Sequence, residues 1–293
     1  MTALFVALCV ASLVGCTAGS SAEAIPPLRQ GVVTANQQSQ TAFADVNAML
    51  REQQLDRVVN QPTLSEDAFF SAIAAEELAV WHRAFASIEV YFGKLEMLLS
   101  PDRRTEVEGE LRTLGTDLEQ RYAVARGEEL PPGIAAGFVK LGGLLVQLKA
   151  GQDAVVIIRK VNPAVQDIFL SMAEAIGTRD AEGNLEGVRG TVWTAWTQQL
   201  GTFQVAFLNA DSAQKRRIAE QYLEMLGERE AHDRALASFR ASILALGAAH
   251  DQLAQGDRVS AAGLIRIVQE EYKGLRDEIA AMKAAREAAG GGQ

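Results

Sequence analysis

The sequence contains very little cysteine, and both cysteines lie near its start, at Cys9 and Cys16. The chain from residue 17 to residue 293 therefore has no thiol that could form an internal disulfide or serve as a cysteine nucleophile. A protein without disulfides has to be stabilised by its hydrophobic core alone. The length of 293 residues and the hydrophobic share of 48% are sufficient for a sizeable core.

Basic residues are also scarce. The chain has 28 Lys and Arg against 37 Asp and Glu, a formal net charge of −9. Nucleic acids and anionic lipid surfaces are bound through a basic patch, which this composition does not favour. We therefore expect neither nucleic acid nor anionic lipid to be the main partner.

Motifs of nucleophilic and phosphate chemistry are absent as well. The sequence contains no Gly-x-Ser-x-Gly element and no glycine-rich phosphate loop. We accordingly predict no catalytic residues, and a protein that is not an enzyme.

Proline is sparse, and none of the seven prolines follows Pro163. The sequence is rich in alanine and has few alternating Val, Ile and Thr residues, which favours helix over sheet. Pro62, Pro101, Pro132 and Pro163 each stand where a helix could begin. Together these signals predict an all-α protein with helices near 32–59, 64–99, 101–126, 132–160, 163–176, 184–209, 212–255 and 259–287.

Apolar residues recur at alternating steps of four and three in the second, seventh and eighth of these segments. The longest series runs from Ile218 to Leu253. This spacing is typical of helices packed at about +20°, as in coiled coils. A helix over 212–255 would be about 65 Å long at 1.5 Å per residue. We predict an elongated antiparallel bundle with long coiled-coil-like helices.

The segment 133–158 is unusually apolar and rich in glycine. Gly133 and Gly137 are spaced so that another helix could approach closely, and Phe138, Leu141 and Leu145 supply apolar side chains. One interpretation is a central helix wrapped by the bundle, because all-round hydrophobicity indicates burial. The alternative is a concealed segment that inserts into a membrane and forms a pore.

The chain has three histidines, His82, His232 and His250. His232 and His250 fall on the apolar seam of the long helix, and Glu228 lies one turn from His232. A histidine in such a position is a metal ligand, a pH-sensitive group or a hydrogen-bonded core residue. His232, His250 and Glu228 are therefore the candidates for a metal or small-ligand site in the bundle core.

Trp193 and Trp196 begin an aromatic stripe at helical spacing that continues to Phe207. Such a stripe is either packed in the core or exposed as a surface for a partner. We take the two tryptophans as the candidate partner face.

The N-terminus carries an uncharged apolar run from Ala3 to Gly15 that ends in Leu13-Val14-Gly15-Cys16. The run is shorter than the roughly 20 residues needed to cross a bilayer, but it suits a secretory signal. Its end resembles the lipobox of bacterial lipoproteins. That resemblance implies cleavage before Cys16 and a diacylglycerol on its thiol. Thr17, where lipoproteins retained at the inner membrane carry Asp, implies the periplasmic face of the outer membrane.

We therefore expect a signal peptide over residues 1–15, an acylated cysteine and flexible tether over 16–31, a helical body over 32–287 and a disordered tail over 288–293. The expected function is that of an envelope lipoprotein acting as a structural or adaptor bundle. Its partners would be the membrane, through the lipid at Cys16, and another envelope protein or a second copy. No other cofactor is expected. Membrane insertion through 133–158 and ligand binding in the core are the alternatives.

Overall fold

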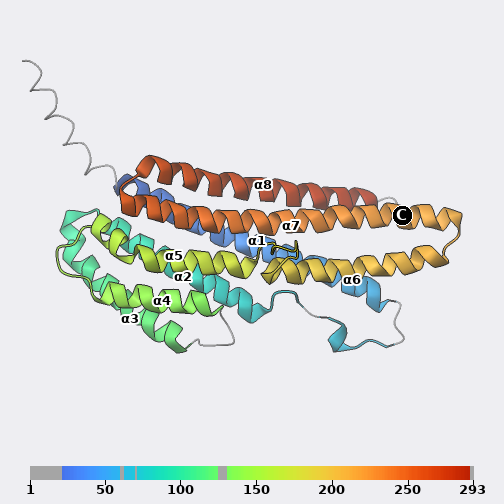
Figure 1. The fold of residues 1–293 in the computed structure, drawn as a ribbon, viewed down its shortest axis with the longest axis horizontal. Coiled ribbons are helices and arrows are strands. Elements are labelled where there is room, and N and C mark those ends of the chain that lie inside the picture. Colours follow the sequence, from blue (N-terminus) through green and yellow to red (C-terminus); the bar gives the residue numbers. More distant parts are fainter. Residues whose placement is uncertain (1–21, 60–62, 70, 125–130, 291–293) are drawn as a thin grey trace, which may run out of the picture.

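The longest helix, α7 (Ser212–Gln255), extends along the molecule in the computed structural model (Figure 1). Its 44 residues correspond to about 65 Å. The structure describes residues 22–59, 63–69, 71–124 and 131–290. Within these ranges the regular elements are helices, and the single β-bridge joins Arg179 and Leu185. The predicted all-α class is confirmed.

Four helices pack lengthwise on α7. Helices α1 (Ile25–Val58) and α8 (Arg258–Gly290) run antiparallel to it, whereas α5 (Ala154–Ile176) and α6 (Gly187–Asn209) follow one another end to end (Figure 1). Helix α5 contacts the C-terminal half of α7, where Gly247 meets Phe169, and α6 contacts the N-terminal half, where Arg189 meets Asp233. The long helices of the expected elongated bundle are thus present.

The remaining helices make the two ends of the molecule unequal. Helices α2 (Ala75–Met97), α3 (Arg104–Val124) and α4 (Pro132–Val146) join α5 at one end, which is therefore thick (Figure 1). The other end is thin and consists mainly of α6 and α7. Short 3₁₀ turns occupy Ala22–Ala24, Glu66–Ala68 and Pro101–Arg103.

A cluster of aromatic rings joins three helices near the middle of the core. Phe43 of α1, Trp81 and Phe85 of α2, and Phe239 of α7 are buried, with ring centroids 5.6 to 6.4 Å apart. Several of these rings meet edge to face, the arrangement that aromatic quadrupoles favour. The predicted seams of α2 and α7 thus meet at this cluster.

Helix α1 begins earlier than the sequence pattern indicated. Residues 22–31 were expected to belong to a flexible tether, but they form a 3₁₀ turn and the first turns of α1. Ile25 and Leu28 are fully buried, and Pro26 and Pro27 lie in the first helical turn, where a missing N–H has no partner to lose. Because this apolar pair is buried, residues 22–31 belong to the helical body and not to the predicted tether.

Helix α2 begins later than predicted, at Ala75 rather than near residue 64. The side chain of Asn47 on α1 holds the backbone of Ile73 through two hydrogen bonds. Its Oδ1 accepts from the Ile73 N–H (3.1 Å), and its Nδ2 donates to the Ile73 carbonyl (2.9 Å). These two backbone groups are thereby satisfied outside a helix. A long-range contact, which no local pattern reveals, sets this boundary.

The predicted division between helices 132–160 and 163–176 was wrong. The break falls at residues 147–153, where Gly151 has a φ of +80° and Asp153 caps α5 by accepting from the Val156 N–H. Pro163 lies inside α5, where it removes one backbone hydrogen bond. Packing of α5 against α4 and α7 over both sides of Pro163 keeps the helix continuous.

The predicted tail is partly helical, because α8 continues to Gly290. The expectation of disorder at 288–290 is therefore corrected, and residues 291–293 lie outside the described part of the chain.

Candidate interaction surface

The thin end of the molecule is a helical hairpin that has no core of its own. From Gly201 of α6 to Glu230 of α7, no residue is buried, although both helices are fully formed there. We call residues 201–230 the distal arm. The turn between its helices is well defined, because Asp211 accepts from the N–H groups of Ala213 and Gln214 and its own N–H donates to the Gln214 side chain. Such a capping box fixes the start of a helix.

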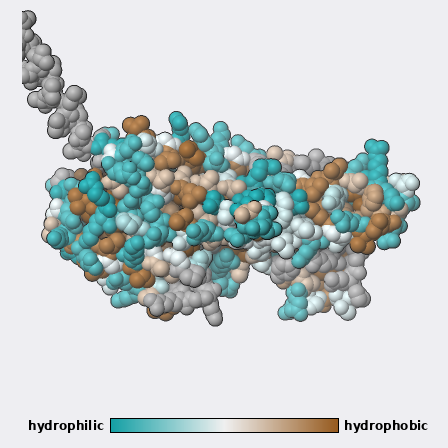
Figure 2. All heavy atoms as spheres, viewed as in Figure 1, coloured by the Kyte–Doolittle hydropathy of each residue, from teal (hydrophilic) through white to brown (hydrophobic). Residues whose placement is uncertain are grey.

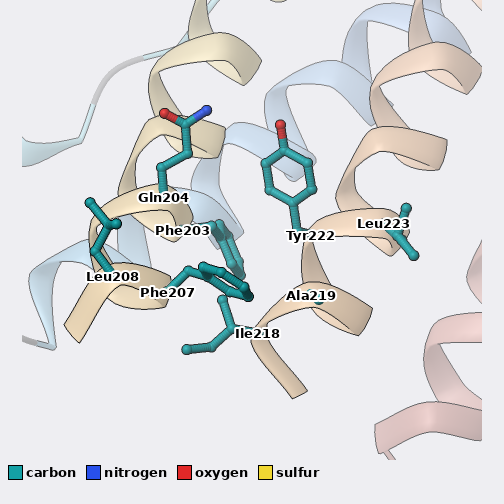
Figure 3. Close-up of a pocket in the computed structure, with 8 residues that line it drawn as sticks. All are labelled: Phe203, Gln204, Phe207, Leu208, Ile218, Ala219, Tyr222 and Leu223. Carbon is teal, nitrogen blue, oxygen red and sulfur yellow. The ribbon is translucent and has the colours of Figure 1, made fainter. Parts of the chain in front are cut away.

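An apolar groove of about 550 Å³ lies between the two helices of the distal arm. Phe203 and Phe207 point into the space between the helices, while Leu208 and Leu223 stand at its two sides (Figure 3). Leu208 is 77% exposed and Leu223 is 66% exposed. Apolar side chains are accordingly visible at this end of the surface (Figure 2). Exposed apolar patches of this kind mark interaction sites in soluble proteins.

Helix α6 carries no charged side chain from Gly190 to Ala210. Its outward side presents Thr197, Gln198 and Gln204 together with the apolar Val205 and Leu208. Exposed helix faces are usually charged, and a helix without a charged stripe is normally covered. Depletion of charge is also the compositional signal of the centre of a protein interface. The uncovered side of α6 therefore has the chemistry of a contact surface.

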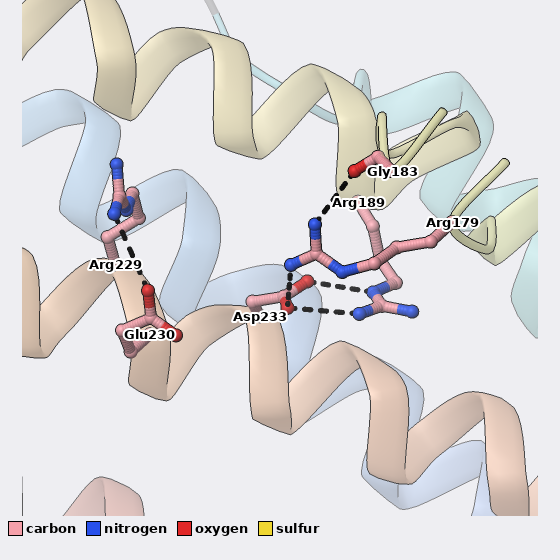
Figure 4. A network of polar contacts seen from close by, with 6 residues as sticks. All are labelled: Arg179, Gly183, Arg189, Arg229, Glu230 and Asp233. Carbon is pink, nitrogen blue, oxygen red and sulfur yellow. Dashed lines mark hydrogen bonds and ion pairs between the residues drawn. The ribbon is translucent and has the colours of Figure 1, made fainter. Parts of the chain in front are cut away.

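A network of charged residues holds the base of the arm. The guanidinium of Arg189 on α6 donates to both carboxylate oxygens of Asp233 on α7, at 2.8 and 3.0 Å (Figure 4). Arg179 approaches the same carboxylate at 3.7 Å and donates to the Gly183 carbonyl. The side chains of Arg189 and Asp233 are only 12% and 13% exposed. A bidentate pair with this much burial fixes the register of α6 on α7.

The structure separates the two tryptophans of the predicted partner face. Trp196 is buried, so it is unavailable to a partner and that part of the prediction is corrected. Trp193 is half-buried and its ring lies near two guanidinium groups, with Arg229 4.0 Å and Arg179 5.5 Å from its ring centroid. Stacking of this kind is a favourable cation–π arrangement. The contact surface instead continues outward from Trp193 along α6 to Leu208.

His232 and Glu228 form a structural contact within the bundle. The His232 Nδ1 lies 2.8 Å from the backbone carbonyl of Glu228, and its Nε2 lies 3.1 Å from a carboxylate oxygen of Asp45 on α1. The ring also packs 5.9 Å from Trp196. Both ring nitrogens thus have protein partners, and the arrangement joins α1, α6 and α7.

His250 lies at the centre of a second buried network. The Asn162 Nδ2 donates to Asp251 at 2.7 Å, so the Asn162 Oδ1 accepts from His250 Nδ1–H, also at 2.7 Å. The His250 Nε2 then accepts from the Tyr91 hydroxyl at 3.2 Å. Burial lowers the pKa of His250 to about 3 and raises the pKa of Tyr91 well above 10. Both groups therefore act as neutral hydrogen-bonding groups.

The glycine-rich segment 133–158 divides between α4, a loop and α5. Phe138, Leu141 and Leu145 are fully buried. A methyl group on Gly133 would meet Ser171, and one on Gly137 would meet Ile168, so these glycines admit α5 at close range. The described residues of this segment therefore occupy a packing position inside the bundle. No helix among the described residues is long and apolar enough to cross a membrane.

Two further predictions concern the lipid anchor and a metal site. Cys16 and the signal segment lie outside the described residues. In the ranges that are described, no three His, Cys, Asp or Glu side chains come together as a metal site.

No family description, no curated protein and no solved structure matches the chain.

The sequence pattern predicted only part of this surface. Phe203 and Phe207 belong to the predicted aromatic stripe. Leu208 and Leu223 lie outside both that stripe and the predicted apolar seam of α7. The missing signal is the uncharged stretch of α6, which is visible in the sequence. Asp45 and Asn162 have no sequence signal at all, because their partners are distant in the chain.

Proposed function

We propose that the protein is a lipid-anchored adaptor of the bacterial envelope, which holds the distal arm away from the membrane as a protein-binding surface. The observation that carries the proposal is the uncharged, uncovered side of α6 at one end of an elongated bundle. The lipobox-like sequence at Cys16 supports attachment to lipid at the other end.

The opposite placement of the two ends follows from the packing of α1 on α7. Gly31 lies against Leu246, and Asp45 lies against His232, so α1 runs from the thick end towards the arm. From the level of Leu246 to Ala219, α7 advances about 40 Å at 1.5 Å per residue. An anchor before residue 22 would thus leave the arm far from the lipid surface.

Tethering explains how a modest contact surface could be effective. Confinement of two partners to one membrane raises their effective concentration, so that even a weak contact is populated. In this mechanism the bundle acts as a rigid spacer, the lipid determines the location, and α6 with the groove determines the partner.

The anchor and the surface can be tested separately. Cys16→Ser should abolish incorporation of labelled fatty acid and remove attachment through lipid. Absence of label on the wild-type protein would contradict the anchor.

For the surface, a photo-crosslinking amino acid at Leu208 should capture a defined protein in cells, whereas the same group at the exposed Leu170 of α5 should not. Equal capture at both positions would contradict a specific role for the arm.

A further inference from the structure

We propose that the distal arm binds the distal arm of a second copy of this chain, with the two α7 helices antiparallel about a two-fold axis at Leu223. This inference rests on the proposed function, since it names the partner of the same surface. The charges and side-chain sizes along the exposed side of α7 support this pairing.

Three exposed residues of α7 stand seven residues apart on one face, namely Arg216, Leu223 and Glu230. In an antiparallel pair related by two-fold symmetry, residues equally far before and after the axis meet. With the axis at Leu223, Arg216 of each copy meets Glu230 of the other, and the two Leu223 side chains meet at the centre. The face is therefore complementary to itself.

Small residues beside Leu223 allow the two helices to approach. Ala219 lies four residues before Leu223 and Gly227 four residues after it, so they also meet across the axis. A methyl group on Gly227 would have no neighbour within 4 Å in the single chain. Small residues at a helix crossing permit close contact between backbones. The second copy would then cover the Leu223 side of the groove.

The charges of the distal arm favour a second copy over a lipid surface. The arm has almost equal numbers of the two signs. Three basic residues stand together near the start of α7, namely Lys215, Arg216 and Arg217. The charged residues that follow are acidic except for Arg229, namely Glu220, Glu224, Glu228 and Glu230. Antiparallel pairing places opposite signs together, which steers the correct register. An anionic membrane would instead be repelled by the acidic part.

The pairing has a geometric consequence. Each α7 advances about 35 Å from Leu223 to Leu246, and α1 adds about 13 Å from there to residue 22, at 1.5 Å per residue. The two N-terminal ends of the dimer would therefore lie roughly 95 Å apart and face in opposite directions, at the same rise per residue. Such a dimer would reach between two lipid surfaces and hold the paired arms away from both.

The first experiment uses Leu223→Cys in the full chain in cells, with Cys9→Ser and oxidation by a mild copper complex. The two-fold axis predicts a disulfide between the two thiols introduced at position 223, and Leu170→Cys serves as a control at an exposed position of the thick end. Absence of a dimer from Leu223→Cys, with a reactive thiol, would overturn the proposal.

The second experiment tests the register by charge reversal. Arg216→Glu and Glu230→Arg, each combined with Leu223→Cys, should both lower the dimer yield, because each reversal places like charges together at two symmetric contacts. We expect a loss of about tenfold, which corresponds to about 1.4 kcal/mol. Co-expression of the two differently tagged variants should restore a mixed dimer, because both of its contacts then join a glutamate of one chain to an arginine of the other. Failure of the mixture to recover would exclude this register.

Failure of the inference can be told apart from failure of the proposed function. Capture of a different protein at position 223 without any dimer would retain the adaptor and reject the second copy. Protection of the thiol of Leu223→Cys by vesicles rich in anionic lipid, again without a dimer, would reject both in favour of lipid contact. Fatty-acid labelling of the same variants reports on the anchor independently.

Discussion

At the scale of single residues, burial decides how each candidate group behaves. His250 has the residue type of a metal ligand or a pH switch, yet its two nitrogens are used by Asn162 and Tyr91 and its side chain has no exposure. The charged form would have to be desolvated without a carboxylate directly bonded to the ring, which explains the lowered pKa. His250 is therefore a neutral element of the core.

This state predicts a specific dependence of stability on pH. Because the pKa of His250 is about 3 in the folded protein and 6.5 without burial, the unfolded chain binds a proton between these values and the folded chain does not. Stability should then fall as the pH decreases below 6.5, by about 1 to 2 kcal/mol between pH 6.5 and pH 5. Urea unfolding of wild type and His250→Gln at several pH values measures this effect. The free energy of unfolding should fall more steeply with decreasing pH in wild type than in the variant, and the difference is the contribution of His250. Parallel curves for the two proteins would contradict it.

Two adjacent glycines of α4 should respond oppositely to alanine. A methyl group on Gly142 would lie 2.6 Å from the backbone carbonyl oxygen of Gly115 on α3, whereas one on Gly143 would meet only the end of the Glu119 side chain. We expect Gly142→Ala to destabilise the fold by about 1 to 3 kcal/mol through overpacking. Gly143→Ala should be neutral or stabilising by up to about 1 kcal/mol through helix propensity. Chemical unfolding of both variants checks the contrast, and equal effects would argue against close contact of α3 and α4.

At the scale of elements, the attachment of α6 to α7 depends on few groups. Helix α6 has five buried residues in the described structure, and the last of them is Leu200. The alignment of α6 along α7 therefore depends largely on the pair of Arg189 and Asp233 at its base. A bidentate pair that is nearly buried is costly to break from one side, because the remaining charge stays desolvated.

Asp233→Ala should therefore destabilise the protein by about 2 to 4 kcal/mol, close to the usual range for removing one partner of such a pair. Hydrogen exchange in residues 187–209 should accelerate more than in α5. The control is Glu220→Ala, which removes the exposed pair with Arg216 and should change stability by less than about 1 kcal/mol. A similar effect of both substitutions would show that the base of the arm is held by other contacts.

At the scale of the whole molecule, the two ends should differ in local stability. The same helix α7 passes from a core with Phe239, Leu246 and His250 fully buried into an arm without buried residues. Local opening is governed by the buried contacts that must be broken.

Native-state hydrogen exchange should therefore show low protection for residues 212–230 and high protection for residues 235–254. The exchange is measured on wild type and on Arg216→Glu, in which the proposed pairing of two distal arms is weakened. Uniform protection along α7 in both proteins would contradict the distinction between core and arm. Extra protection of the arm in wild type alone would agree with the proposed pairing.

The amino-acid sequence by itself determined the helical class, the elongated shape and the seams of α2 and α7. These properties depend on local propensity and on periodicity, which are written in consecutive residues. It also contained the uncharged stretch of α6, from which a surface can be predicted. The helix boundaries at Ile25, Ala75, Asp153 and Pro163 were misplaced, because they depend on packing or on local caps that outweighed the proline signals.

Only the tertiary structure decided which apolar residues are covered. Trp196 and Leu208 belong to the same helix, yet Trp196 lies under His232 of α7, whereas Leu208 extends past the core and remains exposed. Periodicity reports the face of a helix on which a residue lies, but not how far the neighbouring helices reach along it. That reach depends on the register between α6 and α7, which the long-range pair of Arg189 and Asp233 sets.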